Sequence, residues 1–510
     1  MLIFHLDFNF VNLRYEFVRE LMARVAALGY DAILWELENQ VAWESCPECA
    51  DEGAWTKAQF HELLDYSRAL GLEPIPLLQT IGHAEYVLSH PKYHSFREHP
   101  GYSDCYCVSN PSVRPFLQRW IAEYCEMFSG LKYFHLGGDE AYRFGSCRNC
   151  SVRDRHALYG EHIDALAADL KARNIRPGIW GDMILEDADK LDSISRDVVI
   201  WDWNYATGIG TPKTVRVWGV GEVSKETVTP ELRKRFPELL ASSGELNPFY
   251  TADALQNRGH DVILCSAARS SCDGPFCPNT GIHAPNIAGA AAKCRDSRLS
   301  GHCVTSWAIR LNPLMAGLPL LDLPAVAAAA PDAGLEAWRR QTGRRHFGFE
   351  AGLDAADQLS CCDGRLRSFS AVQWSGLKDS RPVPPGFLAG QIRRWIAERE
   401  PWWLEREAML ACMRASTQQG LSMLEPYAAQ WATAALWTRA GRLQLEYLDL
   451  LQNLFTPMTP PSPLRQRLQD FKVEVEAYFE CEQTPDSARK NAGLVVDPLL
   501  DYQKNIGFGC

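Results

Sequence analysis

The sequence has no uninterrupted apolar segment long enough to cross a membrane, because the best candidate, residues 318–330, contains Pro319, Asp322 and Pro324. It also has no excess of basic residues: 52 Lys and Arg stand against 63 Asp and Glu, a formal net charge of -11 at pH 7. This balance argues against nucleic acid, anionic membrane surfaces and polyanionic polymers as main partners. We find no internal repeat, low-complexity tract or heptad pattern.

A basic start followed by an apolar core is absent too, because residues 1–7 already have the pattern of a buried strand. We therefore expect a cytoplasmic protein. Seventeen cysteines, an odd number, favour free thiols and metal ligands over a fully paired set of disulfides. With 510 residues, 46% of them hydrophobic, the chain is long enough for a barrel domain and a companion domain.

Short apolar runs alternate with amphipathic stretches over the first 310 residues, which predicts βα units and a parallel sheet closed into a (β/α)8 TIM barrel. The expected strands are 2–8, 32–37, 74–79, 133–136, 176–180, 198–203, 262–266 and 303–307. Residues 207–248 have no clear pattern, and we interpret them as an insertion on the substrate face. Because the later sequence is helical, we predict a catalytic barrel over residues 1–340 and an all-α domain over residues 341–510.

The most informative stretch is YFHLGGDE at residues 133–140, where an apolar run ends on Gly137 and Gly138 and is followed by Asp139 and Glu140. Successive side chains of a strand point to opposite faces, so both acids can serve one ligand only if the strand ends there. Glycines permit that bend and the close approach of a substrate ring. Neighbouring carboxyls also push each other's pKa values apart, which suits glycoside cleavage. The alternative is a turn with two solvated acids.

The pattern His-x-Gly-Gly-Asp-Glu, placed where a fourth barrel strand should end, resembles the motif of glycoside hydrolase family 20, the β-N-acetylhexosaminidases. Over about its first two thirds, the chain is most similar to the hexosaminidase D branch. The resemblance implies an exo-acting, retaining enzyme for terminal β-linked N-acetylglucosamine or N-acetylgalactosamine. It also implies substrate-assisted catalysis, in which the 2-acetamido oxygen is the nucleophile, an oxazolinium ion is the intermediate and no catalytic cofactor is needed.

The resemblance also assigns roles to the two acids. Glu140 would be the general acid that protonates the leaving oxygen and later deprotonates water. Asp139 would stay ionised, orient the acetamido N–H and offset the positive charge of the intermediate. His83, in a Gly-His turn after the third strand, resembles a histidine found near the acid in this family; the alternative is an ordinary loop histidine.

An N-acetyl methyl group needs an apolar, shaped recess, for which flat aromatic walls are well suited. Trp180, Trp201 and Trp307, at the ends of the fifth, sixth and eighth strands, match positions where the family places such walls. Core packing is the alternative for any single tryptophan. Trp203 and Tyr205 are further candidates, and Tyr205 is one source of a hydroxyl for the acetamido oxygen.

Asp7 and Glu38, at the ends of the first two strands, are candidates for holding sugar hydroxyls, and His135 for orienting groups behind the acids. Two family features are missing. Residues 7–10 lack the usual arginine, and Ile309 stands where an acid usually follows the eighth-strand tryptophan. The sequence therefore leaves open the choice between N-acetylglucosamine and N-acetylgalactosamine. A sugar-binding protein without turnover and a glycosidase for sugars without an acetamide are the rival functions.

Two Cys-x2-Cys pairs offer the four soft ligands of a tetrahedral structural zinc. The pairs are Cys46 with Cys49 and Cys147 with Cys150. Both follow strands on the same face of the barrel, and the loop between them contributes Cys105 and Cys107 as alternatives. Free or paired thiols are the competing interpretation. Such a zinc would clamp the loop just past Glu140 and be structural. The helical domain is a candidate either for a homodimer contact or for shielding the barrel.

Overall fold

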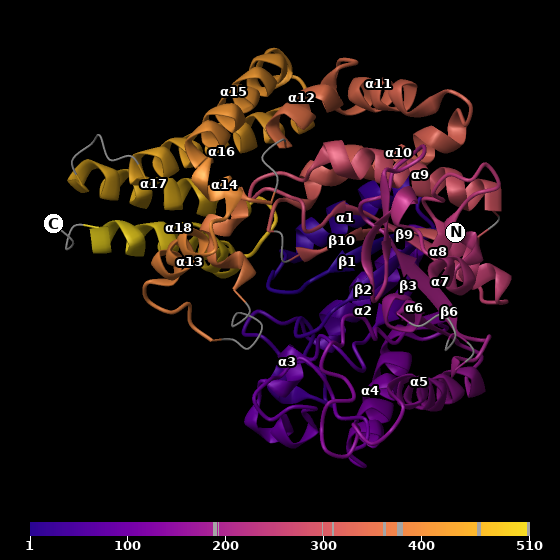
Figure 1. Ribbon diagram of the computed structural model, residues 1–510. Helices are drawn as coiled ribbons and strands as arrows, with labels where there is room; N and C mark the ends of the chain where they lie inside the picture. The colour runs from indigo at the N-terminus through magenta and orange to yellow at the C-terminus, as the bar shows by residue number, and fades with distance from the viewer. Residues whose placement is uncertain are drawn as a thin grey trace. The chain divides into compact units, whose positions relative to one another are not determined.

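The computed structural model describes residues 1–186, 191, 193–297, 299–308, 311–360, 364–374, 381–455 and 461–506. It confirms the predicted (β/α)8 barrel, several of whose strands are labelled in Figure 1. The strands close in the order β1-β10-β9-β6-β5-β4-β3-β2. The strands are β1 (Leu2–Asp7), β2 (Ala32–Glu36), β3 (Glu73–Leu77), β4 (Tyr133–His135), β5 (Arg176–Trp180), β6 (Val199–Trp203), β9 (Val262–Arg269) and β10 (Gly301–Ser306).

The parallel register brings the strand ends to one level. Asp7 lies opposite Glu36, Glu36 opposite Leu77, and Leu77 opposite His135. His135 in turn lies opposite Gly178 of β5. Residues that follow these positions therefore meet at the carboxyl rim of the barrel, where barrel enzymes place their catalytic groups.

One of the helices between the strands begins at a capping box. Thr56 caps α2 (Lys57–Ala69): the Gln59 N–H donates to Thr56 Oγ1 over 3.2 Å, and the Thr56 N–H donates to Gln59 Oε1 over 3.0 Å. The other helices up to residue 297 are α1 (Tyr15–Ala27), α3 (Glu85–Leu88), α4 (Val113–Phe128), α5 (Arg155–Ala172), α6 (Asp182–Leu185), α7 (Pro230–Arg235), α8 (Tyr250–Asn257) and α9 (Thr280–Ser297). The region without a clear pattern contains α7 and a hairpin of β7 (Thr214–Val217) and β8 (Gly221–Ser224).

Contacts divide the chain into two compact units. The first comprises residues 1–9, 22–267 and 285–305, and the second residues 10–21, 268–284 and 306–510. The predicted domain boundary after residue 340 remains a prediction. The predicted helical C-terminal region is confirmed, and its helices are α10 (Leu318–Ala329), α11 (Gly334–Phe347), α12 (Gly352–Ser360), α13 (Phe387–Ala397), α14 (Pro401–Leu404), α15 (Arg406–Leu424), α16 (Ala432–Phe455), α17 (Pro461–Phe479) and α18 (Pro485–Ile506) (Figure 1).

The second unit has its own core around α16. Leu443, Tyr447 and Leu451 recur every fourth residue along this helix, and all three are buried, as is Trp437. The Trp437 indole N–H also donates to the carbonyl oxygen of Ala316 over 3.1 Å, which satisfies its polar atom inside the core. Among the described residues, no helix combines the length and the apolar composition needed to cross a membrane.

Candidate active site

The chain turns sharply after β4 because two glycines occupy conformations that other residues avoid. Gly137 and Gly138 have φ angles of 66° and 93°. A Cβ on Gly137 would lie 2.1 Å from Gln79 Oε1, and one on Gly138 would lie 2.6 Å from Tyr159 Oη. The Gly137 N–H donates to His135 Nδ1 over 3.0 Å, and the Gly138 N–H donates to Gln79 Oε1 over 3.3 Å. The strand therefore ends at the glycines, as the sequence predicts.

Asp139 and Glu140 converge on the ring of His83. His83 Nε2 lies 3.3 Å from Asp139 Oδ2 and 3.5 Å from Glu140 Oε2. The Asp139 side chain is only 7% exposed, whereas that of Glu140 is 39% exposed. Asp139 Oδ1 is buried and has no hydrogen-bond partner among the described residues. The two carboxyls thus meet at one point but occupy different environments, one enclosed and one accessible.

Three residues that follow barrel strands hold a left-handed backbone. Glu38, His83 and Glu140, in the loops after β2, β3 and β4, have φ angles of 42°, 50° and 45°. A non-glycine residue in this region costs on the order of 1–3 kcal/mol, and such residues cluster at functional sites, where the surrounding fold enforces them. The rim that carries the two acids is therefore held in a defined, locally unfavourable shape.

Asp182, which follows β5 and opens α6, belongs to the same site although the sequence analysis did not single it out. Its Oδ2 accepts the backbone N–H of Glu140 over 2.9 Å, and its Oδ1 accepts the indole N–H of Trp203 over 3.1 Å. Burial raises the pKa of Asp182 to about 7, and the negative charge of Asp139 adds to this shift. The sequence feature that could have identified Asp182 is its position just beyond Trp180, at the end of a predicted strand.

A buried chain of polar groups supports the glycine turn from the neighbouring strands. His5 Nε2 lies 2.9 Å from Glu36 Oε2, and Gln79 Nε2 donates to Glu36 Oε1 over 2.9 Å. The other end of Gln79 accepts the Gly138 N–H. Burial opposes the charge of Glu36, but the hydrogen bond and charge of His5 outweigh it and lower the pKa of Glu36. Strand ends β1, β2 and β3 thereby hold the turn after β4.

The predicted aromatic residues form two groups at the ends of β5 and β6. Trp180 and Trp201 are fully buried, and their ring centroids lie 4.4 and 5.0 Å from that of His135. Burial keeps the pKa of His135 well below its ordinary value, so this imidazole is neutral. Trp203 stacks on Tyr205 with centroids 5.2 Å apart. The role of these side chains as walls of an N-acetyl pocket remains a prediction.

The remaining sugar-binding candidates are placed as follows. Asp7 Oδ1 accepts the backbone N–H of Asn9 over 2.8 Å, and Glu38 Oε1 accepts the Asn9 side-chain N–H over 3.2 Å. Asp7 and Glu38 therefore lie around one asparagine. Trp307 belongs to the second compact unit, and Ile309 lies outside the described residues. The predicted sugar contacts of these residues remain predictions.

A cysteine-rich cluster lies in the same unit, but its members differ from the predicted zinc ligands. It consists of Glu98, Cys107, Cys147 and Cys150, whose ligand atoms all lie within 4.8 Å of one another. Cys46 and Cys49 are instead joined to each other by a disulfide. A disulfide sulfur is not a thiolate, so this pair does not complete a four-cysteine site with Cys147 and Cys150. Of the two predicted alternatives, the structure places Cys107 in the cluster and leaves Cys105 outside it.

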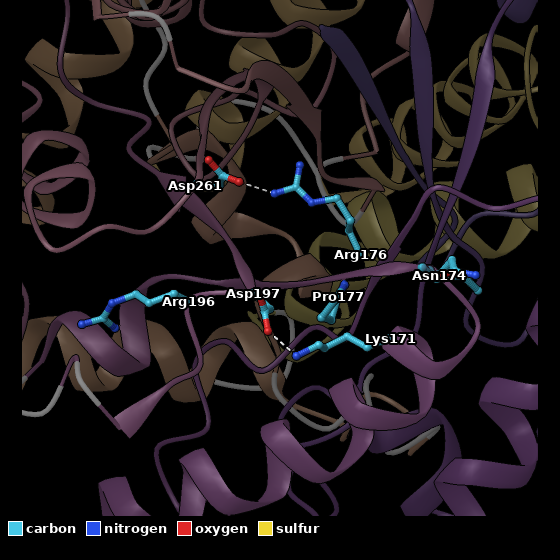
Figure 2. Close-up of a pocket in the computed structure, with 8 residues that line it drawn as sticks. Lys171, Asn174, Arg176, Pro177, Arg196, Asp197 and Asp261 are labelled. Carbon is cyan, nitrogen blue, oxygen red and sulfur yellow. Dashed lines mark hydrogen bonds and ion pairs between the residues drawn. The ribbon is translucent and has the colours of Figure 1, made fainter.

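A separate cavity of about 340 Å³ is lined by residues at the amino ends of the strands (Figure 2). Arg176 is the first residue of β5, and Asp197 and Asp261 stand just before β6 and β9. Ion pairs join Arg176 to Asp261 and Lys171 to Asp197 (Figure 2). Because catalytic groups of barrel enzymes lie at the carboxyl ends of the strands, this paired, charged cavity is not the candidate active site.

Comparison with known proteins gives one matching family model and several relatives. The model of the glycosyl hydrolase family 20 catalytic domain matches residues 25–215. Hexosaminidase D from Bos taurus is 26% identical over 217 residues, which cover 40% of this chain and 63% of the relative. Hexosaminidase D from Homo sapiens is 28% identical over 220 residues, which cover 40% of this chain and 45% of the relative. The chain thus spans less than two thirds of either relative.

Two solved structures are similar to this chain at low sequence identity. A β-N-acetylhexosaminidase from Bacteroides fragilis NCTC 9343 is 18% identical, covers 63% of this chain and 65% of its own, and has a TM-score of 0.45. A chitobiase from Flavobacterium johnsoniae is 15% identical, covers 96% of this chain and 77% of its own, and has a TM-score of 0.46.

Proposed function

We propose that the protein is a retaining, exo-acting β-N-acetylhexosaminidase, because the model of the glycosyl hydrolase family 20 catalytic domain matches residues 25–215. Its substrates are glycans with a terminal β-linked N-acetylglucosamine or N-acetylgalactosamine. The observation that carries this proposal is the convergence of Asp139 and Glu140 on His83, with His83 Nε2 at 3.3 and 3.5 Å from the two carboxyls.

Glu140 acts as the general acid and base. Its accessible carboxyl can reach a leaving oxygen, and its Oε1 accepts the Tyr142 hydroxyl over 3.0 Å. Burial and then the charge of Glu140 raise the pKa of Tyr142, so this phenol stays protonated and donates. In the first step the Glu140 proton passes to the glycosidic oxygen as its bond to C1 breaks. In the second step Glu140 takes a proton from the water that attacks C1.

Asp139 holds the acetamido group. Its buried Oδ1 has no partner among the described residues, which suits an acceptor reserved for the substrate N–H. The acetamido carbonyl oxygen then attacks C1 and forms an oxazolinium ring whose positive charge lies beside the Asp139 carboxylate. Such a fixed charge is most effective where water is excluded. Two successive inversions at C1 leave the product with the configuration of the substrate.

Hydrolysis of three chromogenic substrates tests the proposal. These are the β-N-acetylglucosaminide, the β-N-acetylgalactosaminide and the β-glucoside, which lacks the acetamide. We expect turnover of at least one acetamido sugar, little turnover of the glucoside, and a β-configured first product by NMR. Binding of the sugars without turnover would favour the sugar-binding alternative, and preference for the glucoside would favour another glycosidase mechanism.

A matched pair of variants links this activity to the site. For a substrate whose leaving group needs protonation, Glu140→Gln should lower turnover by orders of magnitude, whereas Glu126→Gln, at an exposed position of α4, should leave it unchanged. Equal activity of the two variants would contradict the proposal.

A further inference from the structure

The cluster of Glu98, Cys107, Cys147 and Cys150 has no role in the proposed reaction. We propose that it binds one structural Zn²⁺ through three thiolates and one carboxylate oxygen. This inference goes beyond the proposed hydrolase function, and its test does not depend on activity.

The distances between the ligand atoms match a tetrahedral zinc site. Cys107 Sγ lies 3.6 Å from Cys147 Sγ and 3.8 Å from Cys150 Sγ, and Cys150 Sγ lies 3.4 Å from Glu98 Oε2. With Zn–S of about 2.3 Å and Zn–O of about 2.1 Å, a regular tetrahedron has S···S edges of about 3.8 Å and S···O edges of about 3.6 Å. Sulfurs joined in a disulfide lie about 2.05 Å apart, so none of these sulfur pairs is a disulfide.

The burial and charge of the four side chains also favour the binding of a cation. Glu98 and Cys150 are each 1% exposed, and Cys107 is 6% exposed. In the part of the chain that the structure describes, no Lys, Arg or His side chain forms an ion pair with Glu98. A buried carboxylate is strongly unfavourable unless it is paired or bound to a metal, and a dication also favours the thiolate form of three adjacent cysteines.

Neighbouring groups hold the ligands in place. The Cys147 N–H donates to Glu98 Oε1 over 2.9 Å, which leaves Oε2 directed at the sulfurs. Ser109 Oγ lies 3.1 Å from Cys150 Sγ, a distance at which its hydroxyl donates to a thiolate. Such supporting hydrogen bonds orient metal ligands and tune their affinity.

Glu98 and Cys107 come from two paired segments of the loop after β3. The Glu98 N–H donates to the carbonyl oxygen of Cys105 over 2.8 Å, and the Cys107 N–H donates to that of Phe96 over 2.7 Å. This antiparallel pairing brings the carboxylate and the thiol side by side although eight residues separate them in the chain.

Cys147 and Cys150 flank a tight turn, in which the Cys150 N–H donates to the carbonyl oxygen of Cys147 over 3.1 Å. This turn follows Glu140 in the loop after β4. The other two ligands follow His83 in the loop after β3. A zinc ion here therefore ties together the two loops that carry the candidate catalytic groups.

Zinc is favoured over other metals by the donor set. Three soft thiolates exclude magnesium and calcium, which take oxygen ligands, whereas a single carboxylate among thiolates is compatible with tetrahedral zinc. All four positions are occupied by protein atoms, which indicates a structural ion instead of a catalytic one with an open position.

Metal analysis of the unaltered full chain tests the proposal most directly. Elemental analysis after purification without metal-affinity resin should give about one zinc per chain. X-ray absorption at the zinc edge should show about three sulfurs at about 2.3 Å and one oxygen at about 2.0–2.2 Å. Absence of stoichiometric zinc would overturn the proposal, and a shell of four sulfurs would overturn the assignment of Glu98.

Variants then test which cysteines bind the ion. Cys107→Ser and Cys150→Ser should each lose bound zinc in a chelator competition, whereas Cys105→Ser should retain it. The double variant Cys46→Ser/Cys49→Ser should also retain one zinc. If it lost its zinc, the ligands would be Cys46, Cys49, Cys147 and Cys150, and the proposed ligand set would be refuted. If a ligand variant does not fold, as circular dichroism would reveal, the absorption spectrum of the unaltered chain still decides.

Discussion

The substitution Asp182→Asn removes a buried carboxyl whose ionisation the fold opposes. Burial, helped by the charge of Asp139, raises the pKa of Asp182 from 3.8 to about 7. Between these values the folded chain keeps a proton that the unfolded chain has released, so the folded state loses stability as the pH rises from about 4 to 7. At about 1.4 kcal/mol per pKa unit, a difference of about three units amounts to about 4 kcal/mol.

The substitution also removes one hydrogen bond. The carboxylate of Asp182 accepts two N–H groups, one from Glu140 and one from Trp203. An amide offers one oxygen and one NH2 group, so one buried N–H loses its acceptor at a cost of about 1–3 kcal/mol. We therefore expect Asp182→Asn to be less stable than the wild type by about 1–3 kcal/mol at pH 4 and more stable by about 1–3 kcal/mol at pH 8.

Hydrogen exchange followed by mass spectrometry measures this stability difference in the part of the chain around Asp182. Peptides from β4 to β6 report the unit that holds Asp182, which matters because the two compact units need not unfold together. The variant and the wild type are compared at the same pH, at pH 4, 6 and 8. Asp332→Asn, at an exposed position, is the control and should show no difference. A stability difference for Asp182→Asn that stays constant from pH 4 to pH 8 would refute the reasoning.

Two further predictions concern the acids and the turn that holds them. Glu140→Gln should lower kcat/KM by about 10²–10⁴ for substrates whose leaving groups need protonation, and much less for substrates with acidic phenols as leaving groups. Asp139→Asn should lower kcat/KM equally for the two kinds of substrate. The same dependence on the leaving group in both variants would contradict the separate roles of the two acids. Gly82→Ala should remove most activity, because its Cβ would lie 2.3 Å from the Asp139 carbonyl oxygen. Gly317→Ala should keep its activity, because its Cβ would meet nothing within 4 Å. Equal activity of these two variants would show that the close approach of Gly82 to Asp139 is unimportant.

The barrel could be predicted from the sequence because buried parallel strands are continuous apolar runs between helices. The predicted strand at residues 176–180 coincides with β5, and the one at 32–37 extends one residue beyond β2. Residues 207–248 resisted prediction because they form a small hairpin and short helices stabilised by local contacts. Thr229, for example, accepts the Leu232 N–H at the start of α7. Because such a segment is stabilised by local contacts, its sequence does not need the regular spacing of apolar residues by which helices and strands are predicted.

The two acids of the site could be predicted because they are neighbours in the chain, whereas His83 was expected near them only from the family resemblance. Asp139 and Glu140 follow a strand and two glycines, so their position was apparent. Asp182 reaches Glu140 through the pairing of β4 with β5, which adjacent sequence does not encode.

The members of the cysteine-rich cluster were predicted only in part for the same reason. Local spacing identified Cys147 with Cys150, but it equally favoured Cys46 with Cys49. The structure instead brings in Glu98 and Cys107 through irregular loops after β3.

A crystal structure with a bound thiazoline, which copies the cyclised intermediate, tests the central claim most directly. We predict that Asp139 Oδ1 lies about 2.7–3.2 Å from the ring nitrogen of the inhibitor, which donates when it is protonated as in the oxazolinium ion, and that the Glu140 carboxyl lies beside the anomeric carbon. Both carboxyls turned away from the inhibitor would contradict the account.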